Sequence, residues 1–198
     1  NPAVLYLSSQ IDPYEATRQR IREVTASWAD RMTLPDIRRS FERFLGDGVT
    51  PATLDHFQIG SMDATWISAH AAIPPRAMLY CHGGGFQIGS VRSHAEFIGR
   101  WSAACDARIL AFDYRLAPEH RFPAASDDAF AAYCWMLDKG IYPDAIAGDS
   151  AGGNLALTTA MRARDSGLPL PRGIVLLSPW LDLTMSGASY TALAAQDI

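Results

Sequence analysis

The feature that most constrains this fold is a serine flanked by glycines, in the segment Gly148-Asp149-Ser150-Ala151-Gly152-Gly153. The segment follows the apolar residues 145–147 and precedes an Ala- and Leu-rich stretch with helical spacing. A strand therefore has to turn abruptly into a helix at Ser150. Small residues two positions before and two after the serine let strand and helix approach closely, and the turn places the serine at its tip. Ser150 is a candidate nucleophile, because the first amides of the helix face any negative charge that develops beside it.

A second glycine segment, His82-Gly83-Gly84-Gly85-Phe86, follows directly after the apolar strand predicted at residues 77–81. A tetrahedral oxyanion requires two or three backbone donors aimed at one point, and glycines leave that approach open. A glycine run can also be a plain flexible turn, but its position immediately after a strand argues against that interpretation. The predicted donors of an oxyanion hole are the N–H groups of Ala151, Gly84 and Gly85, with Gly83 as an alternative.

From about residue 50 onward, apolar strands alternate with helical stretches. The pattern predicts antiparallel strands at 54–59 and 64–69, further strands at 77–81, 108–114, 145–147 and 173–178, and helices at 93–105, 124–139 and 151–166. This alternation is typical of a mostly parallel sheet with helices on both faces and right-handed connections. Residues 173–178 have the apolar run of a buried strand, but they would form an edge if no later strand paired with them.

Residues 12–45 predict two amphipathic helices. Asp12 is the expected cap of the first, and Pro13 fits its first turn. The apolar stripes are Tyr14, Ile21, Val24 and Trp28 in the first helix, and Ile37, Phe41, Phe44 and Leu45 in the second. These stripes fit either docking against a core or a lid over a pocket. The chain is therefore divided into a helical cap segment, residues 1–48, and an α/β core, residues 49–198.

Composition excludes several classes of function. The chain has 198 residues and a net charge of −4, so nothing predicts binding to nucleic acid or to an anionic membrane. No apolar run reaches the roughly 20 residues that span a bilayer, and the first residues lack the cationic start of a signal peptide. The three cysteines, Cys81, Cys105 and Cys134, are widely spaced. They predict reduced thiols, a cytoplasmic location and no zinc site.

Other polar and aromatic residues allow two interpretations each. The five histidines all precede Ser150; we expect His82 to shape the glycine loop and the others to be surface or structural residues (His56, His70, His94 and His120). Four charged residues fit either a catalytic carboxylate group or buried ion pairs that brace loops (Asp113, Arg115, Glu119 and Asp127). Three residues fit either a substrate pocket or core packing (Phe86, Ile88 and Tyr114).

Together with three further segments, these motifs resemble the hormone-sensitive-lipase-like, or bacterial family IV, esterases over about residues 75–185. The segments are Asp113-Tyr114-Arg115-Leu116-Ala117-Pro118-Glu119, Phe122-Pro123-Ala124-Ala125 and Ser178-Pro179-Trp180-Leu181-Asp182-Leu183-Thr184. The resemblance implies an α/β-hydrolase core with a two-part helical cap, one part of it N-terminal. It also implies hydrolysis of small, short-chain acyl esters by a serine esterase through an acyl-enzyme, without metal or cofactor.

In this family the triad acid and histidine follow the serine in chain order, and no histidine follows Ser150 here. The resemblance therefore implies a core truncated after about its sixth strand. Residues 1–198 alone are expected to be inactive, and to self-associate or require a complementing C-terminal segment. Two alternatives stay open. One is a non-catalytic small-molecule-binding homologue, such as the plant gibberellin receptors, which keep the serine motif but lack the catalytic histidine. The other is a related lactonase or amidase.

Overall fold

The computed structural model describes residues 12–28, 32–70 and 73–194. It contains a six-stranded sheet with the strand order β1-β2-β4-β3-β5-β6. The strands are β1 (Thr53–Ile59), β2 (Met62–Ser68), β3 (Arg76–Cys81), β4 (Ala107–Phe112), β5 (Ala145–Asp149) and β6 (Gly173–Leu177). The helices are α1 (Pro13–Ala26), α2 (Leu34–Gly46), α3 (Val91–Cys105), α4 (Ala124–Asp138), α5 (Ala151–Asp165) and α6 (Ala188–Ala192).

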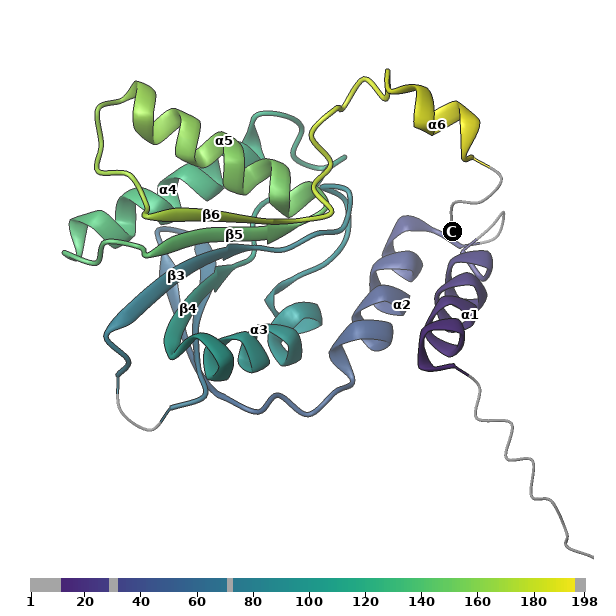
Figure 1. Ribbon diagram of the computed structural model, residues 1–198, viewed down its shortest axis with the longest axis horizontal. Helices are drawn as coiled ribbons and strands as arrows, with labels where there is room; N and C mark the ends of the chain where they lie inside the picture. The colour runs from purple at the N-terminus through teal and green to yellow at the C-terminus, as the bar shows by residue number, and fades with distance from the viewer. Residues whose placement is uncertain (1–11, 29–31, 71–72, 195–198) are drawn as a thin grey trace, which may run out of the picture.

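The sheet has an antiparallel side and a parallel side. The hairpin β1–β2 joins β4 in antiparallel fashion, whereas β4, β3, β5 and β6 run parallel to one another. Helices α4 and α5 cover one face and α3 covers the other (Figure 1). The mostly parallel sheet and the antiparallel first pair predicted from the sequence pattern are confirmed, and so is the α/β-hydrolase core implied by the family resemblance.

The core is divided between the two faces of the sheet. Along β3, Leu79 belongs to the cluster under α4 and α5, while Met78 and Tyr80 belong to the cluster under α3. This alternation follows from the two-residue period of a strand. Because both faces of β3 are covered, its residues from Ala77 to Cys81 are all buried, which is why the run in the sequence is continuously apolar.

Three features differ clearly from the sequence prediction. Strand β4 ends at Phe112 rather than at Tyr114, and the Asp113 carboxylate just beyond it accepts the N–H of Val91 at 2.6 Å. The short helix α6 was not predicted. Strand β6 is the last strand of the sheet, and its Ile174 and Val175 are 40% and 36% exposed. In the described part of the chain, β6 is therefore an edge rather than a buried strand.

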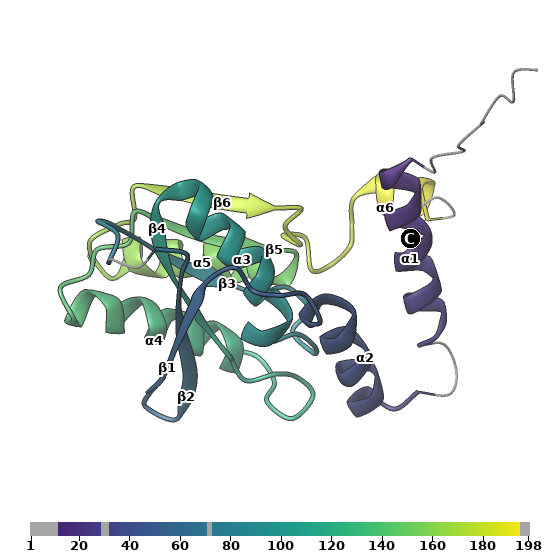
Figure 2. The ribbon, with the colours of Figure 1, turned by 90° about the horizontal axis from the view of Figure 1, so that it is seen from below.

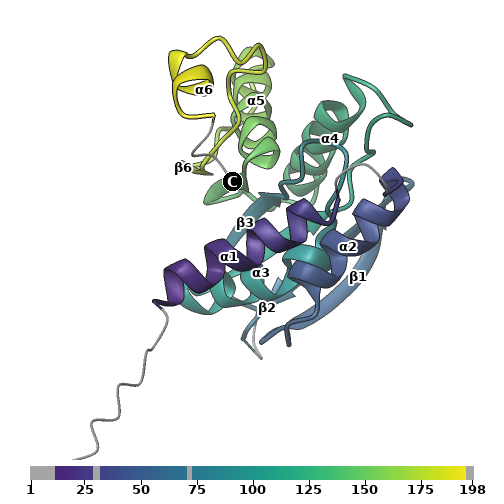
Figure 3. The same cartoon turned by 90° about the vertical axis from the view of Figure 1, so that its right-hand side faces the viewer.

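The two N-terminal helices lie at one end of the sheet, with α1 farther from it than α2 (Figures 1 and 2). Figure 3 views the molecule from this side, with both helices in front of α3. The Trp28 indole donates to the Ser40 hydroxyl at 2.9 Å, and its ring lies 6.2 Å from that of Phe41. Tyr14 is 65% exposed, so its place in the predicted stripe is wrong. No helix among the described residues combines the length and apolar character needed to cross a bilayer.

Candidate active site

Ser150 occupies the turn between β5 and α5. Its backbone has φ +51° and ψ −118°, a conformation that residues with side chains rarely adopt. Its N–H donates to the Leu177 carbonyl at 3.0 Å, which ties the turn to the end of β6. A Cβ on Gly148 would clash with the Gly152 carbonyl, and a Cβ on Gly152 would clash with the Cys81 carbonyl. The glycines flanking the serine are thus required by the close approach of β3, β5 and α5.

The glycine loop after β3 makes a tight turn. The Gly84 carbonyl accepts the N–H groups of Gln87 and Ile88, both at 3.0 Å. Gly84 has φ +121° and Gly85 has φ +60°, and a Cβ on Gly84 would clash with the Ile88 carbonyl. The N–H groups of Gly84 and Gly85 bind no acceptor among the described residues. Two adjacent backbone donors are therefore free at the same end of the sheet as Ser150.

The amide of Gly83 is already bound. It donates to Asp149 Oδ1 at 2.9 Å, so it is not free to bind a substrate. This corrects the sequence-based choice of Gly83 as an alternative oxyanion donor. Burial acts to raise the pKa of Asp149, but hydrogen bonding and charge from His94, and hydrogen bonds from Tyr80 and Gly83, hold that pKa below its ordinary value. The Asp149 carboxylate is therefore ionised at neutral pH.

His82 and Tyr114 form the floor of the glycine loop. The His82 Nδ1–H donates to the Gly83 carbonyl at 2.8 Å, and its ring stacks on Tyr114 with a centroid separation of 4.1 Å. The Tyr114 hydroxyl donates to the His82 carbonyl at 2.8 Å. Burial lowers the pKa of His82 to about 3, so the ring is neutral at neutral pH and a weak base. These contacts fit the expected role of His82 in shaping the loop.

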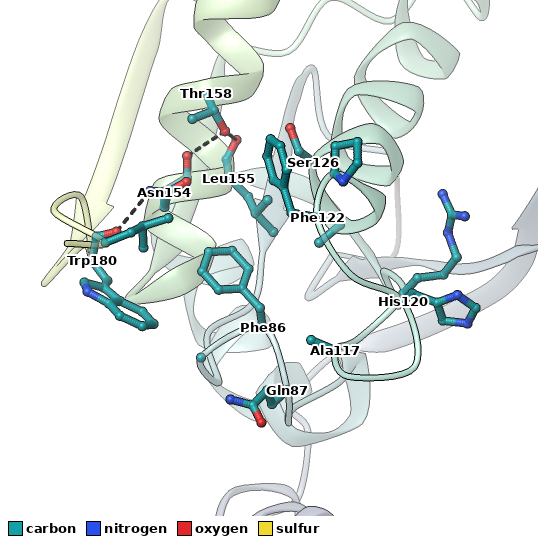
Figure 4. Close-up of a pocket in the computed structure, with 15 residues that line it drawn as sticks. Phe86, Gln87, Ala117, His120, Phe122, Ser126, Asn154, Leu155, Thr158 and Trp180 are labelled. Carbon is teal, nitrogen blue, oxygen red and sulfur yellow. Dashed lines mark hydrogen bonds between the residues drawn. The ribbon is translucent and has the colours of Figure 1, made fainter.

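A cavity of about 320 Å³ lies beside the glycine loop, and Ser150 itself is not among its lining residues. Figure 4 shows the Phe86 ring in its middle, with Trp180 on one side and His120 on the other. Asn154 and Leu155, one helical turn beyond Ser150, contribute to its wall. Most of the lining side chains come from the glycine loop, α4, α5 and the segment after β6 (Gly85, Phe86, Gln87, Arg115, Ala117, His120, Phe122, Pro123, Ala125, Ser126, Asn154, Leu155, Thr158, Trp180 and Leu183).

Of the three residues predicted to line a pocket, one lines this cavity. Phe86 lines it, whereas Ile88 and Tyr114 are absent from the lining set, so their assignment to the pocket is corrected. Tyr114 is buried in the core, and Ile88 is held in the turn by its bond to Gly84. Trp180 and Asn154 were not predicted, although Asn154 follows Ser150 at helical spacing, which is the one signal that pointed to it.

The charged residues predicted as a catalytic group or as braces are dispersed. Arg115 makes a bidentate pair with Asp128, whereas Asp127 pairs with Arg162. Glu119 binds Arg38 of α2. These groups brace loops and helices, but the Arg115, Glu119 and Asp127 side chains are 49–52% exposed, so the predicted burial is wrong for them. Among the described residues, no histidine is hydrogen-bonded to Ser150 Oγ.

Known proteins are similar to this chain in sequence and fold. The α/β hydrolase fold family matches residues 78–198. An acetyl-hydrolase of Streptomyces hygroscopicus is 41% identical over 162 residues, which are 81% of this chain and 53% of that protein. The hormone-sensitive lipase of Mus musculus is 36% identical over 135 residues, or 65% of this chain and 18% of that protein.

Solved structures of esterases are also similar to this chain. The crystal structure of an esterase from the bacterial hormone-sensitive lipase family has a TM-score of 0.86 at 39% identity. The match covers 92% of this chain and 62% of that one. The chain thus spans about half the length of the Streptomyces relative and under two thirds of this solved one. The fold, the two glycine motifs and these similarities together show that the chain belongs to the α/β hydrolase fold family, in its hormone-sensitive-lipase-like branch.

Proposed function

We propose that the protein is a serine carboxylesterase that hydrolyses short-chain acyl esters, with Ser150 as its nucleophile. The backbone of Ser150 carries this proposal, because its φ of +51° and ψ of −118° hold a non-glycine residue in a strained turn. Such strain costs about 1–3 kcal/mol and persists where the surrounding structure enforces it, often at functional sites. The free N–H groups of Gly84 and Gly85 lie on the neighbouring loop and support the assignment.

In the proposed reaction, Ser150 Oγ attacks the ester carbonyl and its proton passes to a general base. The N–H groups of Ala151, Gly84 and Gly85 stabilise the oxyanion, and each such donor is worth about 10²–10³ in kcat. The alcohol then leaves with a proton, and water hydrolyses the acyl-enzyme by the same route. We propose that the base and its carboxylate partner come from outside residues 1–198. A segment that supplies them could also pair with the exposed edge of β6.

The cavity between the glycine loop and α5 is proposed to receive the acyl chain. Phe86 and Leu155 offer it an apolar wall, and its volume of about 320 Å³ suits a short chain. Ala125→Phe, at the α4 side of the wall, would narrow this space. We expect the kcat/KM ratio of butanoate to acetate esters to fall by about tenfold or more, the scale of one or two methylenes in a closed pocket. An unchanged ratio would remove the cavity from the proposal. The helices in residues 1–48 are proposed to cap the site.

The nucleophile is tested in the product of the complete gene with a fluorophosphonate probe and p-nitrophenyl acetate. Ser150→Ala should abolish labelling and turnover. Ser166→Ala, at the exposed C-terminal end of the same helix, should change neither. Equal labelling of wild type and Ser150→Ala would reject Ser150 as the nucleophile. A folded wild-type protein that binds esters without turnover would favour the receptor-like alternative.

A further inference from the structure

Asp149 connects the two glycine motifs. The parallel ladder between β3 and β5 ends at the pair Cys81 and Gly148. One step beyond that pair, the Gly83 N–H donates to Asp149 Oδ1 at 2.9 Å. A side-chain carboxylate thus takes the place of the backbone carbonyl that a longer ladder would have offered. The glycine loop is held to β5 at the point where the two strands separate.

Other groups fix the carboxylate itself. Asp149 Oδ1 also accepts the Tyr80 hydroxyl at 2.7 Å, and burial raises the pKa of Tyr80, so that hydroxyl stays a donor. His94 Nε2 lies 3.5 Å from the same oxygen, while its Nδ1 lies 3.2 Å from the Ser90 carbonyl. The His94 ring thus bridges the Ser90 carbonyl and the Asp149 carboxylate. A largely buried carboxylate is costly without such a partner.

The carboxylate also sets the position of the loop sterically. A Cβ on Gly83 would clash with the Asp149 carboxylate. Gly83 therefore sits directly against Asp149, and Gly84 and Gly85 are the next two residues along the chain. Misplacing such donors by about 1 Å is enough to lose much of their effect on a reaction.

We propose that Asp149 is a positioning residue of the oxyanion loop. Its carboxylate holds Gly83, and through Gly83 the free N–H groups of Gly84 and Gly85, in register with Ser150. This inference rests on the proposed function, because it concerns donors that act on the developing oxyanion. Such donors act mainly in the transition state, so their displacement lowers kcat and leaves KM nearly unchanged.

Asp144 offers a matched control. It lies just before the other end of β5, and its Oδ2 accepts the Ala77 N–H of β3 at 3.2 Å. The Asp144 and Asp149 side chains are 29% and 30% exposed. Both carboxylates therefore bridge the same two strands at similar exposure, but only Asp149 does so beside the glycine loop. A purely structural role would make their replacements behave alike.

The experiment uses the product of the complete gene with p-nitrophenyl acetate and the variants Asp149→Ala, Asp149→Asn, Asp144→Ala and Asp144→Asn. We expect Asp149→Ala to lower kcat by about 100-fold, the scale of one lost oxyanion donor. Asp149→Asn keeps an acceptor oxygen and should recover about tenfold of that loss. In both variants KM should stay within about twofold of wild type. The Asp144 variants should keep wild-type kcat, whatever stability they lose.

A folded Asp149→Ala protein with wild-type kcat would overturn the inference, and so would equal kcat losses in the Asp149 and Asp144 variants. If Asp149→Ala does not fold, the isosteric pair Asp149→Asn and Asp144→Asn decides. A kcat loss confined to Asp149→Asn supports positioning, and equal values reject it. Ser150→Ala separates the two proposals. If that variant keeps full turnover, the proposed function fails, whereas a dead Ser150→Ala with unaffected Asp149 variants rejects only the role of Asp149.

Discussion

Helices α1 and α5 are nearly equal in length, 14 and 15 residues, but they are held in place in different ways. No residue of α1 is buried, whereas α5 buries eight residues, six of which are glycine or alanine and the other two Leu155 and Thr159. Small side chains allow α5 to lie close against the sheet, so its first turn meets the end of β3. Helix α1 touches its neighbour through a few large side chains, such as Arg20 over the Phe44 ring.

This difference shows which part of the molecule is held in a fixed position by close packing. The candidate site lies at the N-terminal end of α5. There the backbones of β3, β5 and α5 are so close that a methyl group added to Gly148 or Gly152 would clash. Helix α2 is instead attached to the loops beside it by polar contacts. Arg38 of α2 donates to the carbonyls of Gln87 and Ala117 and to both oxygens of Glu119. Close packing resists change, whereas polar attachments at a surface can be released.

The largest expected difference between the two helices is in side-chain truncation. Leu155→Ala in α5 removes a side chain that is only 2% exposed, and should cost about 3 kcal/mol of unfolding free energy. Ile21→Ala in α1, where the side chain is half-buried, should cost under about 1 kcal/mol. Urea denaturation of the complete gene product measures both. Similar midpoints for the two variants would show that α1 shares the core's cooperativity, which would remove the contrast.

A smaller loss is expected from adding one methyl group near the site. Gly152→Ala would gain about 1 kcal/mol of helix propensity, but it forces a Cβ against the Cys81 and His82 carbonyls. Overpacking of this kind costs about 3 kcal/mol, so a net loss of about 2 kcal/mol is expected. Gly173→Ala is the control, because a Cβ there meets nothing within 4 Å. A stable Gly152→Ala protein would contradict the close approach of α5 to β3.

The sequence was most informative about the tightly packed half of the molecule. The strand around residues 77–81 and the helix at 151–166 were predicted because burial on a sheet imposes continuous apolar runs and small residues at fixed spacing. The turn at Ser150 was predicted for a similar reason, because the close approach of strand and helix requires glycine on both sides of the serine. In the N-terminal helices the pattern was weaker. Tyr14 fits an apolar stripe by spacing, but α1 has no neighbour there that covers it.

The contacts around Asp149 were beyond prediction from the sequence. Asp149 meets His94 and Gly83 only because β3, β5 and α3 converge at one end of the sheet, and no spacing in the chain records that convergence. The cavity has the same origin, because α4, α5 and the segment around Trp180 contribute to it from distant parts of the chain. The motifs identify the reactive backbone, whereas the groups that orient it depend on how the elements pack.

The attachment of α2 is tested by removing its anchor. Arg38→Ala deletes four hydrogen bonds to the loops around Gln87 and Glu119. We expect proteinase K to cleave faster within residues 12–46, while the urea midpoint of the core stays unchanged. Arg39→Ala is the control, because Arg39 is 66% exposed and its one ion pair with a described residue is to Asp36 of its own helix. Equal cleavage of both variants would show that apolar contacts with α3 hold α2, and that Arg38 contributes little.

The smallest expected effect is the pH dependence of that same attachment. Hydrogen bonding from Arg38 lowers the pKa of Glu119 from its ordinary value of 4.5 to about 2. Because the pKa is lowered in the docked state, the stabilisation is fully present above pH 4.5 and is lost as the pH falls through about 2. Pepsin cleavage within residues 12–46 is measured for wild type and for Glu119→Gln at each pH. The ratio of the two rates cancels the pH dependence of pepsin itself. The ratio of wild-type to variant cleavage should be low and constant at pH 4.5–5 and rise toward one near pH 2. A ratio that does not change with pH would show that Arg38 holds α2 through the carbonyls of Gln87 and Ala117 alone.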